Sequence, residues 1–277
     1  MTTTIRPTEP LQQGADGAKS RTYDVCVNSR RVGAIRLATD PRFGAGMGRI
    51  EELRIEEADR GRGRGTVAAL AAEEVLRGWG CAQVRLSVPE GAGPALRMAT
   101  ALGYQERSRT MVKQLPGAAP QLPAGCQGRP MRADEFDQWQ RADRENFAQS
   151  WIARGVTEAQ ARAKADAEHR ALLPDGAATA GAHFLVLEAA GCAVGTVWVS
   201  PAPPPAQGAY VYDVRVADEH RGRGHGRALM LLAEQVALAE GQDTLGLHVF
   251  ADNTPALRLY ESLGYRATRR HHFKQLL

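Results

Sequence analysis

Residues 221–226 read Arg-Gly-Arg-Gly-His-Gly, and a matching hexad, Arg-Gly-Arg-Gly-Arg-Gly, occupies residues 60–65, which lie 161 positions earlier. Each hexad stands between a β-branched stretch and a segment with helical spacing of apolar residues, which predicts a strand, a tight loop and a helix. We expect positive φ at Gly224 and Gly226, since glycine adopts it without strain. The N–H groups of such a loop and of its helix converge on one point and bind an anionic phosphate.

The repeat extends beyond the loop. Three further matches occur at the same offset: residues 94–97 with 255–258, 102–104 with 263–265, and 113–115 with 274–276. This period is that of a duplicated domain rather than of a solenoid. The sequence therefore predicts one domain at 21–115 and a second at 129–277.

The remaining segments have linker or tail composition. Residues 116–128 are rich in Pro and Gly and predict a linker, and residues 1–20 predict a disordered tail. The second domain opens with a strand near 129–132 and two helices near 133–154 and 157–172. The first domain has no room for these elements, so we expect it to be truncated.

Composition excludes several classes of protein. The chain has 277 residues, of which 43% are hydrophobic and 24% charged, as in a globular protein. No apolar run reaches membrane-spanning length and the start resembles no secretory signal, so we expect no membrane association. The four cysteines are too scattered for a disulfide framework or a zinc site, which favours a reduced cytoplasm and predicts no metal.

The positive charge does not predict nucleic-acid binding. The net charge is only +4, and just four of the 35 basic residues are lysines. An arginine-rich loop is therefore typical of a GC-rich genome, and a plain surface loop remains one interpretation of the hexads. A dinucleotide site needs Gly-x-Gly-x-x-Gly, and an RNA-binding tract is longer and disordered. The occurrence of both hexads in one structural context favours a functional loop.

The second half resembles the GNAT acetyltransferase superfamily, and the whole chain resembles its tandem two-domain type. A Val-rich strand precedes the glycine loop, and a second motif follows it in the family's order, comprising Asn253, Ala256, Leu259, Tyr260, Leu263, Gly264 and Tyr265. The resemblance covers 127–277 completely and 22–115 in part. It implies an α/β fold in which each domain is a mixed, mostly antiparallel sheet flanked by helices.

The resemblance also implies site residues for acetyl-CoA as cosubstrate. The backbone of Val214, Arg215 and Val216 would pair with the pantetheine arm and supply an N–H to the oxyanion. The pyrophosphate would lie against Arg221, Gly222, Arg223, Gly224, His225, Gly226 and Arg227. Asn253 and Ala256 would contact the cofactor, and Tyr260 would protonate the leaving thiolate.

Each side-chain role has a structural alternative. Tyr260 could be a core aromatic residue, and Asn253 could cap the last helix. Asp213 is the candidate base that deprotonates an amine, although such an acid is more often solvated or salt-bridged. His248 and the pair His271 and His272 are further candidates for the acceptor site, with ordinary polar strand residues as the alternative.

The two halves are not equivalent, because Ala92 and Ala99 stand where the second half has Asn253 and Tyr260. The first domain is therefore predicted to be degenerate, with a structural or regulatory role. We expect acetyl-CoA-dependent N-acetylation in the second domain, by direct attack of an amine on the thioester. Neither motif contains a cysteine, which disfavours a covalent enzyme intermediate. The alternative is a non-catalytic CoA-binding sensor or partner-binding protein.

The acceptor would be a small-molecule amine or a peptide. Five acids on the first helix of the second domain could favour a cationic acceptor or simply form a solvated face, namely Asp134, Glu135, Asp137, Asp143 and Glu145. For the oligomeric state, the duplication is compatible with a monomer of two pseudo-dimeric domains.

Overall fold

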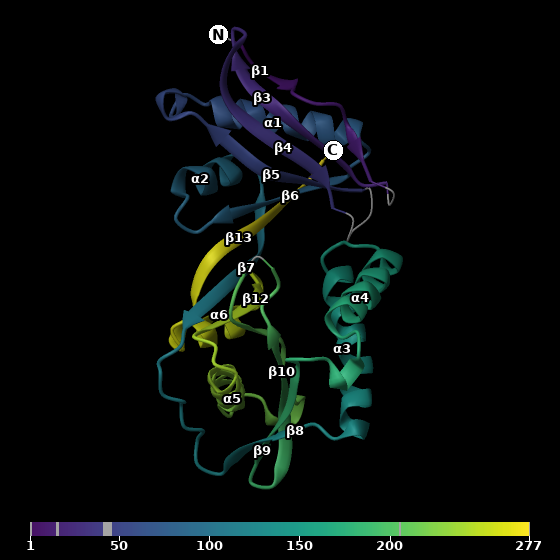
Figure 1. The fold of residues 1–277 in the computed structure, drawn as a ribbon, viewed down its shortest axis with the longest axis vertical. Helices are drawn as coiled ribbons and strands as arrows, with labels where there is room; N and C mark the ends of the chain where they lie inside the picture. The colour runs from purple at the N-terminus through teal and green to yellow at the C-terminus, as the bar shows by residue number, and fades with distance from the viewer. Residues whose placement is uncertain (1, 15–16, 41–45, 205, 277) are drawn as a thin grey trace. The chain divides into compact units, whose positions relative to one another are not determined.

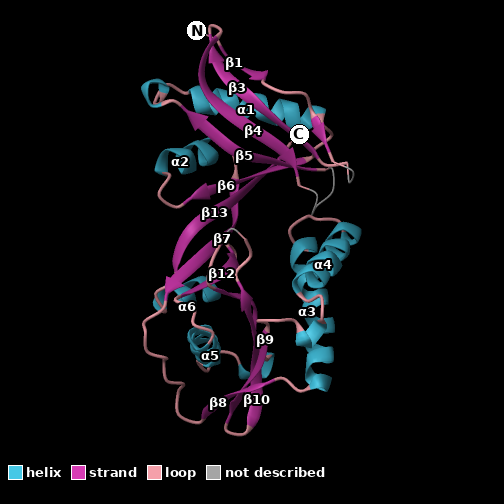
Figure 2. Ribbon diagram, in the orientation of Figure 1, coloured by secondary structure: helices cyan, strands magenta, loops and turns pink. Residues whose placement is uncertain are grey.

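The computed structural model describes residues 2–14, 17–40, 46–204 and 206–276. The chain divides into two compact units: unit 1 combines Met1–Ser108 with Arg269–Leu277, and unit 2 is Arg109–Thr268. Each unit contains helices and a mostly antiparallel set of strands (Figure 1 and Figure 2).

Unit 1 is organised around five neighbouring strands in the order β1-β3-β4-β5-β6. Their bounds are β1 (Thr3–Pro7), β3 (Lys19–Val27), β4 (Arg30–Thr39), β5 (Met47–Ile55) and β6 (Gln83–Pro89), and the short β2 (Gln12–Gln13) pairs with β3. Only β5 and β6 are parallel, because helix α1 (Arg64–Gly78) crosses between them. Helix α2 (Gly93–Ala101) follows β6.

The start of the chain differs from the expected disordered tail. Strand β1 pairs antiparallel with residues 23–27 of β3, and the side chain of Ile5 packs against the core of unit 1. Residues 2–5 read Thr-Thr-Thr-Ile, and β-branched residues favour extended backbone. This short signal was missed because polar threonines surround a single apolar residue.

The truncation of unit 1 therefore concerns helices and not the first strand. Among the described residues before Arg64, strands and a 3-10 turn (Glu57–Asp59) are present but no α-helix. The reason lies on the sheet, where Arg36 of β4 faces Glu52 of β5 in the register. The corresponding pair in unit 2 is Trp198, which is buried, and Asp213, which is partly buried. A charged, exposed pair needs no covering layer.

Unit 2 carries the strand order β7-β12-β11-β10-β9-β8. The strands are β7 (Gln105–Gln114), β8 (Cys126–Pro130), β9 (His183–Ala189), β10 (Cys192–Pro201), β11 (Ala209–Val216) and β12 (Thr244–Phe250). The helices are α3 (Ala133–Ile152), α4 (Glu158–Leu172), α5 (His225–Ala239) and α6 (Thr254–Ser262). The elements expected in this half are thus present, with shifted ends.

The core of unit 2 lies under helix α5. Leu229 and Ala233 are fully buried one turn apart and Leu232 is 6% exposed, as the helical spacing predicts. Helix α5 packs on β9, β10, β11 and β12, which buries the apolar centre of the sheet.

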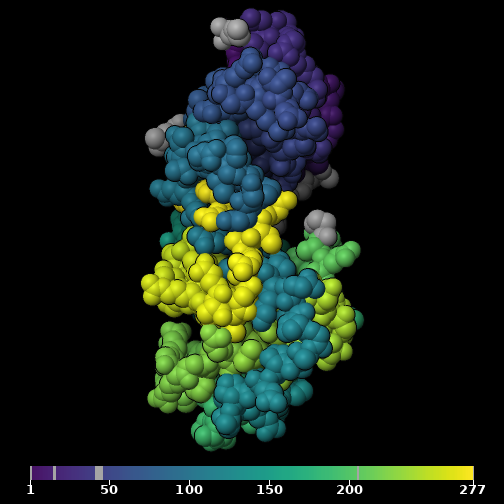
Figure 3. Space-filling view, turned by 90° about the vertical axis from the view of Figure 1, so that its left-hand side faces the viewer, coloured from purple at the N-terminus to yellow at the C-terminus, as the bar shows by residue number. Residues whose placement is uncertain are grey.

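The last strand of each repeat belongs to the other unit. Residues 269–275 of β13 (Arg266–Gln275) pair with β6 in unit 1, whereas residues 109–114 of β7 lie in unit 2, next to β12 in the strand order. Figure 3 shows the yellow C-terminal residues among the blue ones of unit 1. The structural units therefore differ from the predicted boundaries at 21–115 and 129–277, which follow the sequence repeat.

Two equivalent ion pairs accompany this exchange. In unit 1, Lys274 Nζ lies 2.7 Å from Glu73 Oε2, and in unit 2, Lys113 Nζ lies 2.6 Å from Glu234 Oε1. Both glutamates are buried, and the partners stand at equivalent repeat positions. A buried carboxylate needs such a partner, so each exchanged strand completes the core of the unit that it joins.

Candidate functional site

Strands β11 and β12 separate in the middle of unit 2. They pair in parallel only from Ala209 to Val211, opposite residues 245–247, while β11 stays paired with β10 as far as Val216. The backbone of residues 214–216 therefore has one edge without a strand partner among the described residues. This is the stretch expected to pair with a pantetheine arm.

A β-bulge accompanies the separation. In the pairing of β10 with β11, Trp198 faces Asp213 and the next residue faces Val211, so Tyr212 is the extra residue. A bulge bends its strand and increases its twist, which explains why β11 turns away from β12 at this point. Unit 1 has the same shift, since Arg36 faces Glu52 and Leu37 faces Ile50.

The glycine loop leads from β11 into α5 with left-handed backbone at two glycines. Gly222 has φ of 76° and Gly224 has φ of 84°, and Gly224 is the N-cap of α5. Among the described residues, the N–H groups of 222–226 donate to no protein acceptor. These donors lie at the positive end of the helix dipole, an arrangement suited to an anionic group.

Gly226 differs from the expectation of positive φ, because it already lies within helix α5. Its requirement is steric: a Cβ atom there would lie 3.2 Å from Leu259 Cδ2 and 3.9 Å from Val216 Cγ2. Such a contact displaces a terminal methyl group and does not strain the backbone. Only Gly222 and Gly224 need the freedom of glycine in this loop.

The side chains of the loop point to local partners. Arg221 pairs with Asp218 at 2.6 Å, with both side chains largely exposed, and Arg227 donates to Ser262 Oγ. The ring of His225 lies 6.2 Å from that of His220. The phosphate-binding potential of the loop therefore resides mainly in its backbone.

Asn253 is the N-cap of α6, as the capping alternative predicts. Its Oδ1 accepts a hydrogen bond of 3.2 Å from the N–H of Ala256. A contact of its remaining amide group with a cofactor stays a prediction. In unit 1, Ala92 occupies the equivalent position and caps α2 without a side-chain hydrogen bond.

Tyr260 is buried in α6, within the core of unit 2, and is 6% exposed. Burial raises the pKa of Tyr260 to about 12, and the negative charge of Asp213 adds to the rise. The phenol is therefore fully protonated at neutral pH and can donate a proton. The negative charge of Asp213 therefore acts on the phenol of Tyr260.

Asp213 is held among polar groups beneath helices α3 and α4 and is no solvated strand residue. Trp139 Nε1 donates to Asp213 Oδ2 at 3.0 Å, and Arg215 lies 3.8 Å from Oδ1. Burial raises the pKa of Asp213 to about 6, and the Asp143 carboxylate adds to the rise. A carboxyl group with this pKa suits a general base near neutral pH.

Sequence analysis missed Trp139 and His169, and it named Asp143 only as one of five acids that could favour a cationic acceptor. Trp139 and Asp143 stand four residues apart on one face of α3, and His169 Nε2 of α4 lies 2.9 Å from Asp143 Oδ2. The Trp-x-x-x-Asp spacing was the available signal. Of the other four acids on α3, three pair with arginines outside this site: Asp134 with Arg132, Glu135 with Arg129 and Glu145 with Arg162.

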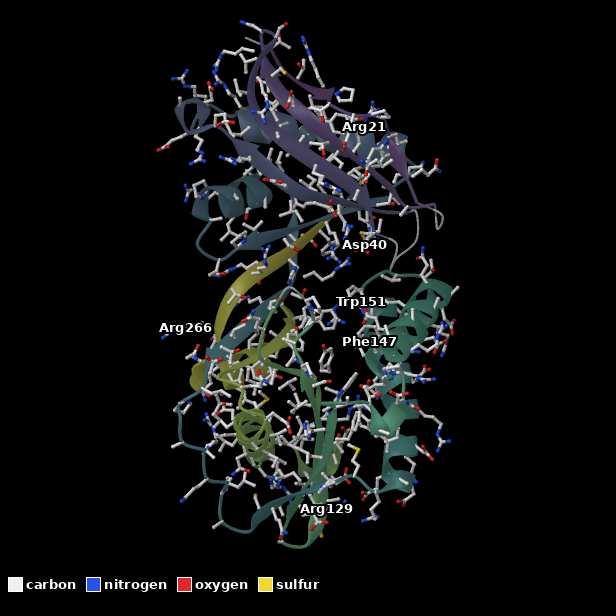
Figure 4. All side chains as sticks on the ribbon, viewed as in Figure 1. Arg21, Asp40, Arg129, Phe147, Trp151 and Arg266 are labelled. Atoms are coloured by element: carbon white, nitrogen blue, oxygen red, sulfur yellow. The ribbon has the colours of Figure 1, made fainter. Side chains whose placement is uncertain are left out.

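Aromatic side chains line the sheet side of the same helices. Figure 4 shows Phe147 and Trp151 extending from α3 toward the strands. The Trp151 ring lies 5.6 Å from Phe250 at the end of β12, and Arg154 lies 3.5 Å from the same ring. Arg154 also binds both oxygens of Asp252 at 2.7 Å, which ties α3 to the loop before α6.

The other candidate histidines lie elsewhere. His248 is exposed on β12, with its ring 5.4 Å from that of Phe250. His271 and His272 belong to unit 1, where His271 Nδ1 lies 2.8 Å from Ser87 Oγ. Burial lowers the pKa of His272. The acid site of unit 2 is built without His271 and His272.

Unit 1 keeps the loop but not the acid site. Gly61 and Gly63 have φ of 71° and 72°, and α1 begins directly after them. Ala99 is fully buried at the position equivalent to Tyr260, and the position of Asp213 holds the exposed Glu52. The backbone arrangement is therefore retained without the buried phenol, and with an exposed carboxylate in place of Asp213.

Across the described residues, no three His, Cys, Asp or Glu side chains form a group that could hold a metal ion. None of the helices in the described part of the chain is both long and apolar enough to cross a bilayer. All four cysteines are free thiols.

Comparison with known proteins gives consistent matches. The acetyltransferase (GNAT) family profile matches residues 3–104 and 134–265. Over 231 residues the chain is 32% identical to mycothiol acetyltransferase of Thermobispora bispora, which covers 77% of this chain and 71% of that protein. It is 29% identical over 149 residues to the uncharacterized N-acetyltransferase YdgE of Bacillus subtilis, covering 53% of this chain and 95% of YdgE.

Two solved structures resemble the whole chain. A GCN5-related N-acetyltransferase from Sphaerobacter thermophilus superposes with a TM-score of 0.58 at 20% identity, covering 92% of this chain and 80% of that one. A tandem GNAT protein from the clavulanic acid biosynthesis pathway gives 0.53 at 21% identity, covering 96% and 85%. These likenesses confirm the predicted α/β fold of tandem type.

Proposed function

The chain belongs to the acetyltransferase (GNAT) family and is an acetyl-transferring enzyme, and we propose that unit 2 alone acetylates an amine acceptor with acetyl-CoA as cosubstrate. One observation carries this proposal: unit 2 combines the open edge of β11 with the buried phenol of Tyr260 and with Asp213, whose charge raises the pKa of that phenol. Unit 1 has the corresponding strand and loop, but Ala99 stands in place of Tyr260 and the exposed Glu52 in place of Asp213.

The backbone of unit 2 fits the cosubstrate. The free N–H groups of 222–226 and the N-terminus of α5 suit a pyrophosphate, which needs several donors and positive potential. The unpaired edge of residues 214–216 suits the amide groups of a pantetheine arm, which would add to the sheet as a short strand. Asn253 has an amide nitrogen left after capping α6.

The proposed reaction is a direct transfer. The nitrogen lone pair of the acceptor forms a bond to the thioester carbonyl carbon, and the carbonyl π electrons move to oxygen. A backbone N–H at residues 214–216 stabilises this oxyanion. The oxyanion then re-forms the C=O bond as the C–S bond breaks, and the electron pair of the C–S bond goes to sulfur, which takes the phenolic proton of Tyr260. The acylated nitrogen loses one proton, and the Tyr260 phenolate regains one, so the protons balance.

Tyr260→Phe tests the role of the phenol. We expect turnover to fall by about 10- to 1000-fold, a range that corresponds to loss of a general acid. Acetyl-CoA affinity should stay nearly constant, because the ring remains in place. The measurement is thiol release with a panel of amines, alongside acetyl-CoA binding by calorimetry.

A matched variant separates chemistry from packing. Tyr265 is buried next to Tyr260, with ring centroids 6.0 Å apart, and its hydroxyl is 3.4 Å from Glu234. Tyr265→Phe removes a buried hydroxyl from the same core and should leave turnover within a few-fold of wild type. Equal losses in the two variants would remove Tyr260 from the mechanism.

For unit 1, the retained loop with Ala99 favours binding without turnover. Its backbone donors keep some attraction for phosphate, while the hydrogen bond available to Asn253 is lost at Ala92. We therefore expect weak CoA binding at most. The test is the double variant Tyr260→Phe, Gly224→Val. Residual acceptor-dependent activity that disappears on adding Gly63→Val would show that unit 1 is catalytic.

A further inference from the structure

A second buried acid and a histidine lie beside Asp213. His169 Nε2 and Asp143 Oδ2 are 2.9 Å apart, and the two residues are 4% and 9% exposed. Resting on the function proposed above, we propose that Asp143 and His169 are positioning residues that make Asp213 the proton acceptor for an amine bound as its ammonium ion.

The helical hairpin fixes the geometry of this cluster. On α3, Trp139 and Asp143 project from one face, so the helix that binds Asp213 through Trp139 Nε1 also presents the second carboxylate to it. On α4, His169 holds that carboxylate in place. Arg215 lies 3.9 Å from Asp143 Oδ1 and 3.8 Å from Asp213 Oδ1, so one guanidinium is shared by both acids.

Every element packed around Asp213 contributes to its proton affinity. Burial and the Asp143 carboxylate of α3 raise the pKa of Asp213, in that order. Arg215 of β11, the Trp139 hydrogen bond and His169 of α4 lower it, in that order. Tyr260 of α6 is neutral at working pH and responds to the charge of Asp213. The net effect is that Asp213 binds its proton more tightly in the folded protein than an aspartic acid does in water.

The charges of the cluster favour a cationic ligand. Two carboxylates share one guanidinium, and the remaining neighbour is an imidazole whose Nδ1 is buried without a partner among the described residues. A buried excess of negative charge is costly unless a cation joins it. An ammonium ion supplies that charge. The ammonium ion then passes one proton to the Asp213 carboxylate, which becomes a carboxylic acid. The nitrogen of the amine thereby regains the lone pair that attacks the thioester.

The pH profile of kcat/KM tests both parts with the best primary amine from the panel. For an acceptor that binds as an ammonium ion, kcat/KM should rise through about pH 6 and then stay level until the amine titrates at about pH 10. An acceptor taken up as the free amine gives instead a tenfold rise per pH unit up to that value. This second profile would overturn the ammonium proposal.

The rise of kcat/KM through about pH 6 is the acid limb of the profile, and two variants should move this limb in opposite directions. Asp143→Asn removes a like charge, so the limb should move to lower pH, by at least about half a unit. His169→Gln keeps a hydrogen-bond donor for Asp143 but removes the imidazole, whose electrostatic effect lowers the pKa of Asp213, so the limb should move to higher pH. Asp137→Asn, an exposed acid of the same helix, is the control and should not move it. If the acid limb does not move in Asp143→Asn and His169→Gln, or moves in the same direction in both, the positioning role is overturned.

A readout without turnover separates this proposal from the proposed function. The pH dependence of urea unfolding of unit 2 reports the pKa of Asp213 in wild type and both variants, whatever the acceptor. Absence of turnover with every amine would contradict the proposed function, while the unfolding series would still show whether Asp143 and His169 shift Asp213. Unchanged pH dependence in both variants would refute the positioning role by itself.

Discussion

Replacing the buried acid of the site should make the protein more stable and inactive at the same time. Asp213→Asn removes a carboxyl group whose pKa is raised from 3.8 to about 6, mainly by burial. A raised pKa means that the ionised form is destabilised by folding. As far as Asp213 is concerned, the free energy of unfolding is at its highest below pH 3.8, where the carboxyl group is protonated. It falls as the pH rises through about 6 and the group ionises in the folded protein.

The magnitude follows from the shift. Each pKa unit corresponds to 1.36 kcal/mol, so ionised Asp213 costs unit 2 about 3 kcal/mol above pH 7. Asparagine carries no charge, and its Oδ1 can still accept the hydrogen bond from Trp139. We therefore expect Asp213→Asn to raise the free energy of unfolding by up to about 3 kcal/mol at pH 8, and by almost nothing at pH 4.

The assay needs a signal from unit 2 alone. Of the four tryptophans, Trp79 belongs to unit 1 and the other three to unit 2. In a Trp79→Phe background, tryptophan fluorescence during urea unfolding therefore follows unit 2. The series runs from pH 4 to pH 8, with Asp137→Asn as the control. A variant that is less stable than wild type at pH 8, or a gain that does not change with pH, would refute the reasoning.

Three further outcomes concern the exchanged strands and the loop. Lys274→Met leaves the buried Glu73 without its partner and should destabilise unit 1 by about 3 kcal/mol, as seen by Trp79 fluorescence, whereas Lys113→Met should do the same to unit 2. If Lys274→Met destabilised unit 2 and Lys113→Met destabilised unit 1, the strand exchange would be contradicted. Gly224→Ala forces a side chain into left-handed backbone and should weaken acetyl-CoA binding in calorimetry, at a stability cost of roughly 1–2 kcal/mol. Gly226→Ala lies in a helix and should leave binding unchanged; equal losses at both glycines would refute this distinction.

Local sequence patterns determined the duplicated architecture and the backbone of the site. The repeat at a constant offset, the glycine loop before α5 and the cap at Asn253 all depend on residues close in sequence. Backbone conformation, capping and amphipathic spacing act over one or two helical turns, so they can be read from the chain. The first strand escaped because its threonines carry little apolar signal.

Only the tertiary structure decided which side chains meet. Trp139, Asp143, His169 and Asp213 come from three elements spread over more than seventy residues, and the bulge at Tyr212 depends on the register between β10 and β11. The exchange of β7 and β13 likewise depends on which sheet edge each strand finds. The pKa of Asp213 arises from burial and from neighbours distant in sequence, and both exist only once the helices have packed on the sheet.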